Sequence, residues 1–462
     1  MKTFTLTFDS GSLVLDGAPH EPRSPHLATA FAWDARVQRW RAPAWAYREA
    51  VIQLTRAAKS GELTFRDDAR AYATLQLEHR AMREPFVYQR EAIDAWRAAG
   101  NRGVVILPTG AGKSYVAEMA MVTAQRATLV VAPTIDLMNQ WATSLATSFG
   151  IEVGMLGGGV HEIRDVTVST YDSAYIHMDR LGARFGLIVF DECHHLPSTT
   201  YLQAADSAIA PFRLGLTATL ERTDGREALL VDRVGPIVYE RTIRELAGEY
   251  LAEYDVQSVT VALDDDEAER YREQREVYRA FLQSQRIHMG APDGWSRFIQ
   301  VASRTQEGRR AFLAYREQKQ IAVASRRKID VLAQLLREHA RERTLIFTND
   351  NDTVYRISRA FLIPALTHQT PVKERAEILA RFNGGQYPAV VTSRVLNEGV
   401  NIPEASVAVI LSGTGSVREH VQRLGRILRR KEGKRAVLYE VITRNTVEEW
   451  VSGRRREHDA YR

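Results

Sequence analysis

Short runs of aliphatic residues recur along the chain from residue 103 onward, separated by helical patterns. The first runs are GVVILP, ATLVVAP, DVTVST, FGLIVFD and FRLGLTAT, each followed by a polar or Gly/Pro turn. Unbroken apolar runs of this length are typical of strands buried on both faces of a sheet. Their alternation with patterns such as YVAEMAMVTAQR and IDLMNQWATSLATSF predicts a parallel sheet covered by helices.

The alternation stops near residue 250 and restarts near residue 343 with RTLIFT, IPALTH, PAVVTS, VAVILSGT and RAVLYEVIT. A chain of 462 residues is too long for one ordinary domain. We therefore predict an α/β protein with two similar-sized α/β domains, at residues 85–250 and 321–450. A small N-terminal domain at residues 1–84 precedes them, a linker with a helical insert at residues 251–320 joins them, and a basic tail at residues 451–462 follows.

The N-terminal segment has a different pattern. FTLTF and LVLDG flank DSGS, which predicts a hairpin within a small α+β domain. The next stretch, RVQRWRAPAWAYREAVIQL, mixes arginines with aromatic residues. Such a mixture suits base stacking and phosphate contacts, but the surface of any small domain looks the same, so both interpretations stay open.

Residues 264–320 are charged and helical, with Tyr278, Phe281 and Leu282 on one helical face. They form either an amphipathic connector packed on a domain or a separate helical insert that contacts a ligand.

Composition adds limits on location and partners. The single cysteine excludes an internal disulfide and favours a reducing compartment. The N-terminus lacks an apolar signal core, and no segment reaches about 18 apolar residues, so we expect a soluble, cytoplasmic protein with no membrane partner. The net charge of +5 is a mild hint of a polyanionic partner.

The stretch LPTGAGKS, residues 107–114, lies between a predicted strand and a predicted helix, which is the context of a P-loop. Loop amides and the helix N-terminus would cradle the phosphates of ATP. Lys113 would pair with the β- and γ-phosphates, and the Ser114 hydroxyl would bind Mg²⁺. The consensus glycine is replaced by Leu107, at the strand end. The phosphate-binding set is Thr109, Gly110, Ala111, Gly112, Lys113 and Ser114.

The stretch FDECHH, residues 190–195, begins at the end of the predicted strand FGLIVFD. Asp191 can hold Mg²⁺ through water, and Glu192 can orient and deprotonate the attacking water. A zinc site is rejected, because structural zinc needs four ligands at wider spacings and the chain has no second cysteine. Cys193 is then a small buried hydrophobe, and His194 would sense the nucleotide and signal to the neighbouring domain.

Nine motifs in this order resemble those of superfamily 2 helicases of the DExH type, and most of all the XPB family of DNA-repair helicases in its short archaeal and bacterial form. They are YQREA, LPTGAGKS, APTIDLMNQW, VSTYDS, FDECHH, GLTAT, LIFTND, VTSRVLNEGVNIP and QRLGRILR. The resemblance spans residues 84–445 and implies two RecA-like domains. By position it implies a damage-recognition domain before residue 84 and a thumb-like insert at residues 264–320.

The resemblance also implies roles for single residues. Gln89 would read the adenine, and Arg426 and Arg429 would be arginine fingers reaching the ATP site from the second domain. The residues implied to couple ATP state to DNA are His194, Thr217, Thr219, Arg222, Asp224 and Gln422.

Three positions depart from the family pattern. The family often has an arginine a few residues before this glutamine, whereas Phe86 and Val87 precede Tyr88 here, which bears on adenine specificity. The family's Arg-Glu-Asp element after TAT is Arg222-Thr223-Asp224 here, and the Gly-Ile-Asp of its second domain ends in Asn401. Each of the last two changes removes one negative charge.

These motifs predict an ATP-dependent DNA helicase or translocase, 3′→5′ by resemblance, acting in nucleotide excision repair. ATP and Mg²⁺ would bind between the α/β domains, and single-stranded or forked DNA would run across both. The resemblance implies a nuclease partner. The alternatives are an ATP-driven clamp that positions a nuclease without processive unwinding, an RNA-directed enzyme, and a degenerate nucleotide-binding module. The last of these is disfavoured by the intact Lys113, Asp191, Glu192, Arg426 and Arg429.

Overall fold

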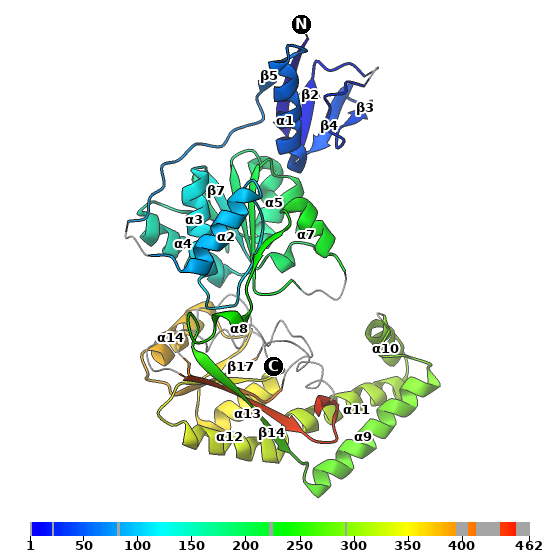
Figure 1. Ribbon diagram of the computed structural model, residues 1–462. Helices are drawn as coiled ribbons and strands as arrows, with labels where there is room; N and C mark the ends of the chain where they lie inside the picture. The colour runs from blue at the N-terminus through cyan, green and yellow to red at the C-terminus, as the bar shows by residue number, and fades with distance from the viewer. Residues whose placement is uncertain are drawn as a thin grey trace. The chain divides into compact units, whose positions relative to one another are not determined.

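The computed structural model describes residues 2–20, 23–80, 84–220, 225–291, 293–393, 405–412 and 435–449. The chain divides into two compact units, one within residues 1–245 and the other within residues 246–462 (Figure 1). The first holds an N-terminal sheet and a parallel α/β sheet, and the second holds another parallel α/β sheet with a helical insert. The predicted fold class is confirmed.

The N-terminal domain is a five-stranded sheet in the order β3-β4-β2-β1-β5 with one covering helix. Its hairpin joins β1 and β2 as predicted, through Ser10 and Gly11 at φ of 48° and 78°. Glycine adopts this left-handed backbone without the clash of a Cβ. The elements are β1 (Thr3–Asp9), β2 (Ser12–Asp16), β3 (Ala32–Asp34), β4 (Arg39–Pro43), η1 (Ala44–Ala46), α1 (Tyr47–Lys59) and β5 (Thr64–Asp67).

Helix α1 buries one face, because Tyr47, Ala50, Leu54 and Ala57 recur every three or four residues. Trp40 of β4 is buried in the same core. The aromatic residues Trp40 and Tyr47 therefore pack inside the domain, and neither presents a ring for base stacking.

The first α/β domain has an eight-stranded sheet in the order β13-β6-β12-β11-β7-β10-β8-β9, parallel except for the β8–β9 pair. The aliphatic runs form its central strands. The elements are α2 (Val87–Ala98), β6 (Arg102–Ile106), α3 (Lys113–Ala124), β7 (Thr128–Ala132), α4 (Ile135–Phe149), β8 (Gly154–Gly157), β9 (Val160–Glu162), β10 (Val166–Thr170), α5 (Tyr171–Leu181), β11 (Leu187–Asp191), η2 (Cys193–His195), α6 (Leu202–Asp206), β12 (Phe212–Thr217), α7 (Glu227–Arg233), β13 (Ile237–Glu240) and α8 (Ile243–Leu246).

The second α/β domain has a six-stranded parallel sheet in the order β14-β19-β18-β15-β17-β16. Its elements are β14 (Glu253–Val261), α12 (Arg326–Glu338), β15 (Thr344–Phe347), α13 (Asn351–Phe361), β16 (Ala365–Leu366), α14 (Val372–Asn383), β17 (Ala389–Thr392), β18 (Val407–Ile410) and β19 (Arg435–Thr443).

Strand β14 lies in the segment that the sequence assigned to a linker. It pairs with β19 over its full length at the edge of the second sheet. The run EYDVQSVTV lacks the unbroken apolar pattern because an edge strand keeps several side chains exposed. The sequence pattern therefore does not predict β14 as a buried strand.

Residues 265–323 form an insert of three helices between β14 and α12 (Figure 1). Its buried side chains form a core of their own. The helices are α9 (Asp265–Ser284), α10 (Gly294–Ala302) and α11 (Gln306–Val323). Phe281 and Phe298 are buried at its centre, with Tyr278 and Leu282 packed against them. This core favours a separate insert over a simple connector.

None of the helices in the described part of the chain is long and apolar enough to cross a membrane.

Phe298 lies at the centre of the insert's core, because its ring centroid is within 6.4 Å of five other aromatic rings. We expect Phe298→Ala to destabilise the insert by roughly 3–5 kcal/mol, from lost burial plus the cavity left behind. Hydrogen exchange across residues 265–323 should then accelerate, while exchange in the six-stranded sheet changes little. Leu313→Ala is the matched control, since Leu313 is 62% exposed. Equal exchange in both variants would contradict an independent insert core.

Candidate nucleotide-binding site

The P-loop connects the end of β6 to the start of α3. Gly110 and Gly112 have φ of 90° and 75°, and Gly112 is the N-cap of α3. Leu107 is fully buried, and its N–H donates to the Thr217 carbonyl at 3.0 Å. This position extends the strand into the core, which explains why leucine replaces the consensus glycine there.

Two side chains of the loop are suited to a phosphate. The Thr109 hydroxyl is buried and has no hydrogen-bond partner among the described residues. Lys113 Nζ donates to the Leu107 carbonyl at 3.2 Å and folds back over the loop. A buried hydroxyl and an ammonium beside a glycine-rich turn at a helix N-terminus fit the phosphates of a nucleotide.

Gln89 of α2 supports the loop through hydrogen bonds. Its side-chain amide donates to the Ala111 carbonyl at 3.1 Å and accepts from the Phe86 N–H at 3.0 Å. The Tyr88 hydroxyl donates to the same Ala111 carbonyl at 2.8 Å. A Cβ on Gly112 would lie 2.6 Å from Gln89 Nε2. Gln89 thus holds the backbone of the P-loop, whatever contact it makes with a base.

Asp191 is buried at the end of β11, which only β12 separates from β6 in the sheet order. One carboxylate oxygen accepts from Trp141 Nε1 at 2.7 Å, and the other accepts from the Glu192 N–H at 3.0 Å. Burial, reinforced by the charge of Glu192, raises the pKa of Asp191 to about 6, while the Trp141 hydrogen bond and the charge of Lys113 oppose this rise. Lys113 and Asp191 therefore act on one another across the site.

Glu192 has a left-handed backbone, with φ of 46° and ψ of 52°. Such a conformation costs a residue with a Cβ about 1–3 kcal/mol, and this strain concentrates at functional sites. The turn ends β11 and starts the short helix η2. It places two adjacent carboxylates, Asp191 and Glu192, at one end of the sheet.

The predicted coupling residues in the described part of the chain, His194, Thr217 and Thr219, form a hydrogen-bonded group beside Glu192. Nδ1 of His194 lies 2.9 Å from the Thr217 hydroxyl and 3.4 Å from Glu192 Oε2. The Thr217 hydroxyl donates to the Thr219 carbonyl at 2.8 Å. His194 and Thr217 are at most 1% exposed. The strand end of β12 is thereby hydrogen-bonded to the turn that carries Glu192.

Cys193 packs against β12 as a buried side chain. It is fully buried, and a Cβ on Gly215 would lie 3.0 Å from its Sγ. Burial raises the pKa of its thiol well above the ordinary value. Within the described ranges, no group of three or more His, Cys, Asp or Glu side chains is placed to hold a metal ion by itself.

Several predicted residues fall outside the described residues: Arg222, Asp224, Asn401, Gln422, Arg426 and Arg429. Their roles stay predictions.

Sequence reasoning gave no role to Trp141 or Tyr171, although both lie within quoted motifs. Trp141 is on the buried face of α4 with Met138 and Leu145, so its pattern indicates only core packing. Tyr171 donates to the Asp191 carbonyl at 2.9 Å. The signal that could have drawn attention to Trp141 is its indole N–H, because a buried donor needs a polar partner.

Three family models match the chain. They are the xeroderma pigmentosum group B helicase damage recognition domain over residues 6–69, the type III restriction enzyme res subunit over residues 83–222, and the helicase conserved C-terminal domain over residues 327–431.

Solved structures share the fold. The Hef helicase domain of Pyrococcus furiosus superposes with a TM-score of 0.50 at 19% identity, covering 80% of this chain and 98% of that one. A variant of S. cerevisiae Dbp5, bound to RNA and ADP BeF3, superposes with a TM-score of 0.57 at 14% identity, covering 82% of this chain and 89% of that one. At these identities the similarity concerns the fold alone.

Curated relatives are more similar in sequence. The DNA 3′-5′ translocase XPB2 of Sulfurisphaera tokodaii is 40% identical over 422 residues, which are 86% of this chain and 96% of the relative. The DNA 3′-5′ helicase XPB of Mycobacterium tuberculosis is 32% identical over 386 residues, which are 80% of this chain and 62% of that protein. With a damage recognition domain, two helicase domains and this identity to the Sulfurisphaera relative over nearly all of its length, the chain belongs to the XPB family of superfamily 2 helicases.

Proposed function

We propose that this XPB-family enzyme is an ATP-dependent motor that moves 3′→5′ along DNA and opens duplexes in nucleotide excision repair. Relatives named DNA 3′-5′ translocase and DNA 3′-5′ helicase support the direction and the polymer. The observation that carries the proposal is the strained turn at Glu192, which sets two adjacent carboxylates at the end of β11, where the charge of the P-loop lysine acts on Asp191.

Different residues bind the phosphates, hold the metal ion and activate the attacking water. Thr109, Lys113 and the amides around Gly110 and Gly112 hold the phosphates. Ser114 and Asp191 would hold Mg²⁺, which when bound neutralises charge developing on the phosphate oxygens. Glu192 orients the attacking water and takes its proton.

Coupling to DNA passes through the residues bonded to Glu192. The single hydroxyl proton of Thr217 has two acceptors within reach, the Thr219 carbonyl at 2.8 Å and Glu192 Oε2 at 3.5 Å, so a change at Glu192 alters the bond from Thr217 to Thr219. Arg222 and Asp224 follow closely in the sequence and act on DNA in this proposal. Arg426 and Arg429 supply positive charge to the γ-phosphate, for which the guanidinium fork is suited.

An association with a nuclease, which rests on family resemblance, is a further part of the proposal, as is a cytoplasmic location, at the nucleoid if the source is prokaryotic.

ATP turnover measured with no nucleic acid, single-stranded DNA, forked DNA and RNA tests the proposal as a whole. We expect forked and single-stranded DNA to stimulate turnover at least tenfold more than RNA, and forked DNA to lose its labelled strand. Stimulation by RNA alone would favour the RNA-directed alternative. Stimulation by DNA without strand displacement would favour the clamp.

Glu192→Gln should reduce ATP turnover by more than tenfold and leave ATP affinity nearly unchanged, because the amide is isosteric but cannot accept the proton of water. Single-turnover hydrolysis and equilibrium binding of a fluorescent ATP analogue separate the two effects. Turnover within tenfold of wild type would remove Glu192 from the role of general base.

Trp141→Phe keeps a ring in the core but removes the donor to Asp191. Because that hydrogen bond lowers the pKa of Asp191, its loss raises the pKa further above 6, and more of the carboxyl is neutral at pH 7. We expect the acidic limb of kcat/KM for ATP to move to higher pH, with activity partly recovered near pH 8.5. Tyr171→Phe is the matched control, since Tyr171 bonds the main-chain carbonyl of Asp191 and should leave the limb in place. A uniform loss at every pH in Trp141→Phe would contradict this role.

A further inference from the structure

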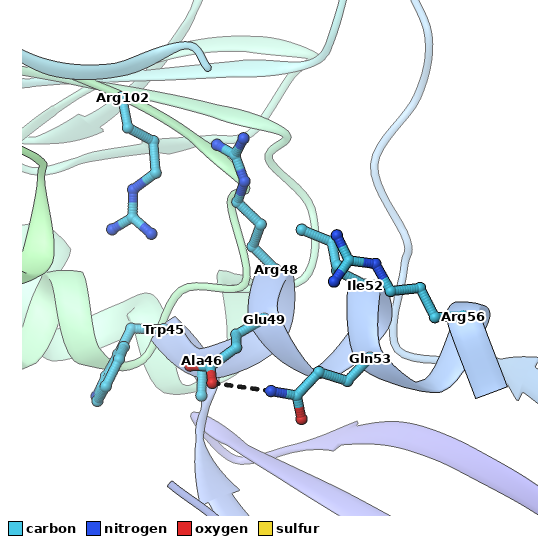
Figure 2. A pocket seen from close by; sticks show the side chains of 8 residues that line it. All are labelled: Trp45, Ala46, Arg48, Glu49, Ile52, Gln53, Arg56 and Arg102. Carbon is cyan, nitrogen blue, oxygen red and sulfur yellow. Dashed lines mark hydrogen bonds between the residues drawn. The ribbon is translucent and has the colours of Figure 1, made fainter. Parts of the chain in front are cut away.

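A cavity of about 310 Å³ lies between helix α1 and the first α/β domain, within the first unit (Figure 2). Helix α1 contributes Arg48 and Arg56 to its lining, and Arg102 at the start of β6 contributes from the other side. Among the described residues that line it, Glu49 alone carries a carboxylate. The lining of the cavity therefore carries an excess of positive charge, and it comes from both the N-terminal domain and the first α/β domain.

The two inner guanidinium groups are held by main-chain carbonyls. Arg48 donates to the carbonyls of Gly100 at 2.6 Å and Pro211 at 3.2 Å. Arg102 donates to the carbonyls of Arg233 at 2.8 Å and Val234 at 3.3 Å. Carbonyls orient these side chains but do not neutralise their charge, and neither arginine makes an ion pair with a described carboxylate.

More positive charge surrounds the cavity. Arg233 stacks on the ring of Trp45, which also lines the cavity, at 4.3 Å from the ring centroid, and pairs with Asp206. Burial first, and then repulsion from Arg48 and Arg233, lowers the pKa of Arg102 to about 10. Burial and repulsion from Arg126 lower the pKa of Arg48. Like charges held this close favour an anion among them.

Glu49 does not fill that role. It is exposed, and its Oε1 accepts from the Gln53 amide at 3.1 Å. Arg56 and Ile52, which both line the cavity, are exposed to solvent, so the cavity is accessible to an anion.

We propose that this cavity is a phosphate-binding site in which Arg48, Arg56 and Arg102 hold one phosphate group and thereby join the N-terminal domain to the first α/β domain. Arginine suits this ligand because its planar fork pairs with two phosphate oxygens at once. The group comes either from the backbone of a nucleic-acid strand or from free inorganic phosphate. The site is separate from the P-loop and does not depend on the proposed motor activity.

The test uses the full chain carrying Lys113→Ala, so that phosphate bound at the P-loop does not dominate. Thermal unfolding is measured in sodium phosphate and in sodium chloride at equal ionic strength. Phosphate also stabilises proteins by exclusion from their surface, so the readout is the difference between variants. Arg56→Gln removes a charge at the opening, and Glu49→Gln removes the opposing charge. Lys59→Gln, on the exposed end of the same helix and outside the cavity lining, is the matched control.

We expect the phosphate-induced rise in Tm to fall by half or more in Arg56→Gln, to grow in Glu49→Gln, and to stay unchanged in Lys59→Gln. Arg48→Gln should abolish it, and phosphate affinity should weaken about tenfold or more for each lost charged hydrogen bond. Because Arg48 also holds the two domains together, Arg56 and Glu49 are the deciding positions. If both of these variants behave like Lys59→Gln, the proposal is wrong.

The source of the phosphate is identified with a single-stranded oligothymidylate, whose binding is measured across salt concentrations in the same variants. If the strand supplies the phosphate, Arg56→Gln should reduce the salt slope by about 0.7. If Arg56→Gln leaves the salt slope of oligothymidylate binding unchanged but lowers the phosphate-induced rise in Tm, the site binds free phosphate. DNA stimulation of ATPase is measured separately, with the same substitutions in a chain that keeps Lys113. A defect in that stimulation alone would concern the motor and would leave the phosphate result standing.

Discussion

The burial of a carboxylate at the end of a parallel strand is the constraint on which this site depends. Asp191 follows four fully buried apolar residues of β11, so its side chain leaves water almost completely. An isolated charge in such a place costs several kcal/mol. The indole of Trp141, the N–H of Glu192 and the charge of Lys113 offset that cost. These partners come from α4, from the strand end itself and from α3. The packing of two helices on the sheet therefore fixes the electrostatics of the site.

The same carboxylate ties the strained turn to its surroundings. The left-handed Glu192 donates its N–H to Asp191, while its side chain reaches toward Thr217 and His194. Each contact holds a conformation that the residue alone would avoid. Glu192 is consequently bonded on one side to a predicted metal ligand and on the other to residues predicted to respond to DNA. A single group thus connects the chemistry to the end of β12, the strand that precedes Arg222.

The residues that support the P-loop act through neutral groups. Gln89 and Tyr88 both donate to the Ala111 carbonyl, which holds the loop at its glycine positions. Just before Gln89, Phe86 stacks on Tyr88, with ring centroids 5.7 Å apart. The N-terminal domain, in contrast, meets the first α/β domain through Arg48, whose charge is not cancelled by the main-chain carbonyls of Gly100 and Pro211 that accept from it.

The sequence by itself determined the buried strands, the P-loop and the paired carboxylates, because each depends on residues adjacent in the chain. An unbroken apolar run, a glycine-rich turn before a helix, and Asp191-Glu192 after β11 are local patterns. Tertiary structure decided the features that depend on contacts between residues far apart in the sequence. Edge strand β14 acquires its place only by pairing with β19, far away in the sequence. Trp40 and Tyr47 turn inward because α1 covers the N-terminal sheet. Trp141 donates a hydrogen bond to Asp191, which lies fifty residues further along the sequence. Such contacts form between elements that only folding brings together, and no spacing along the chain encodes them.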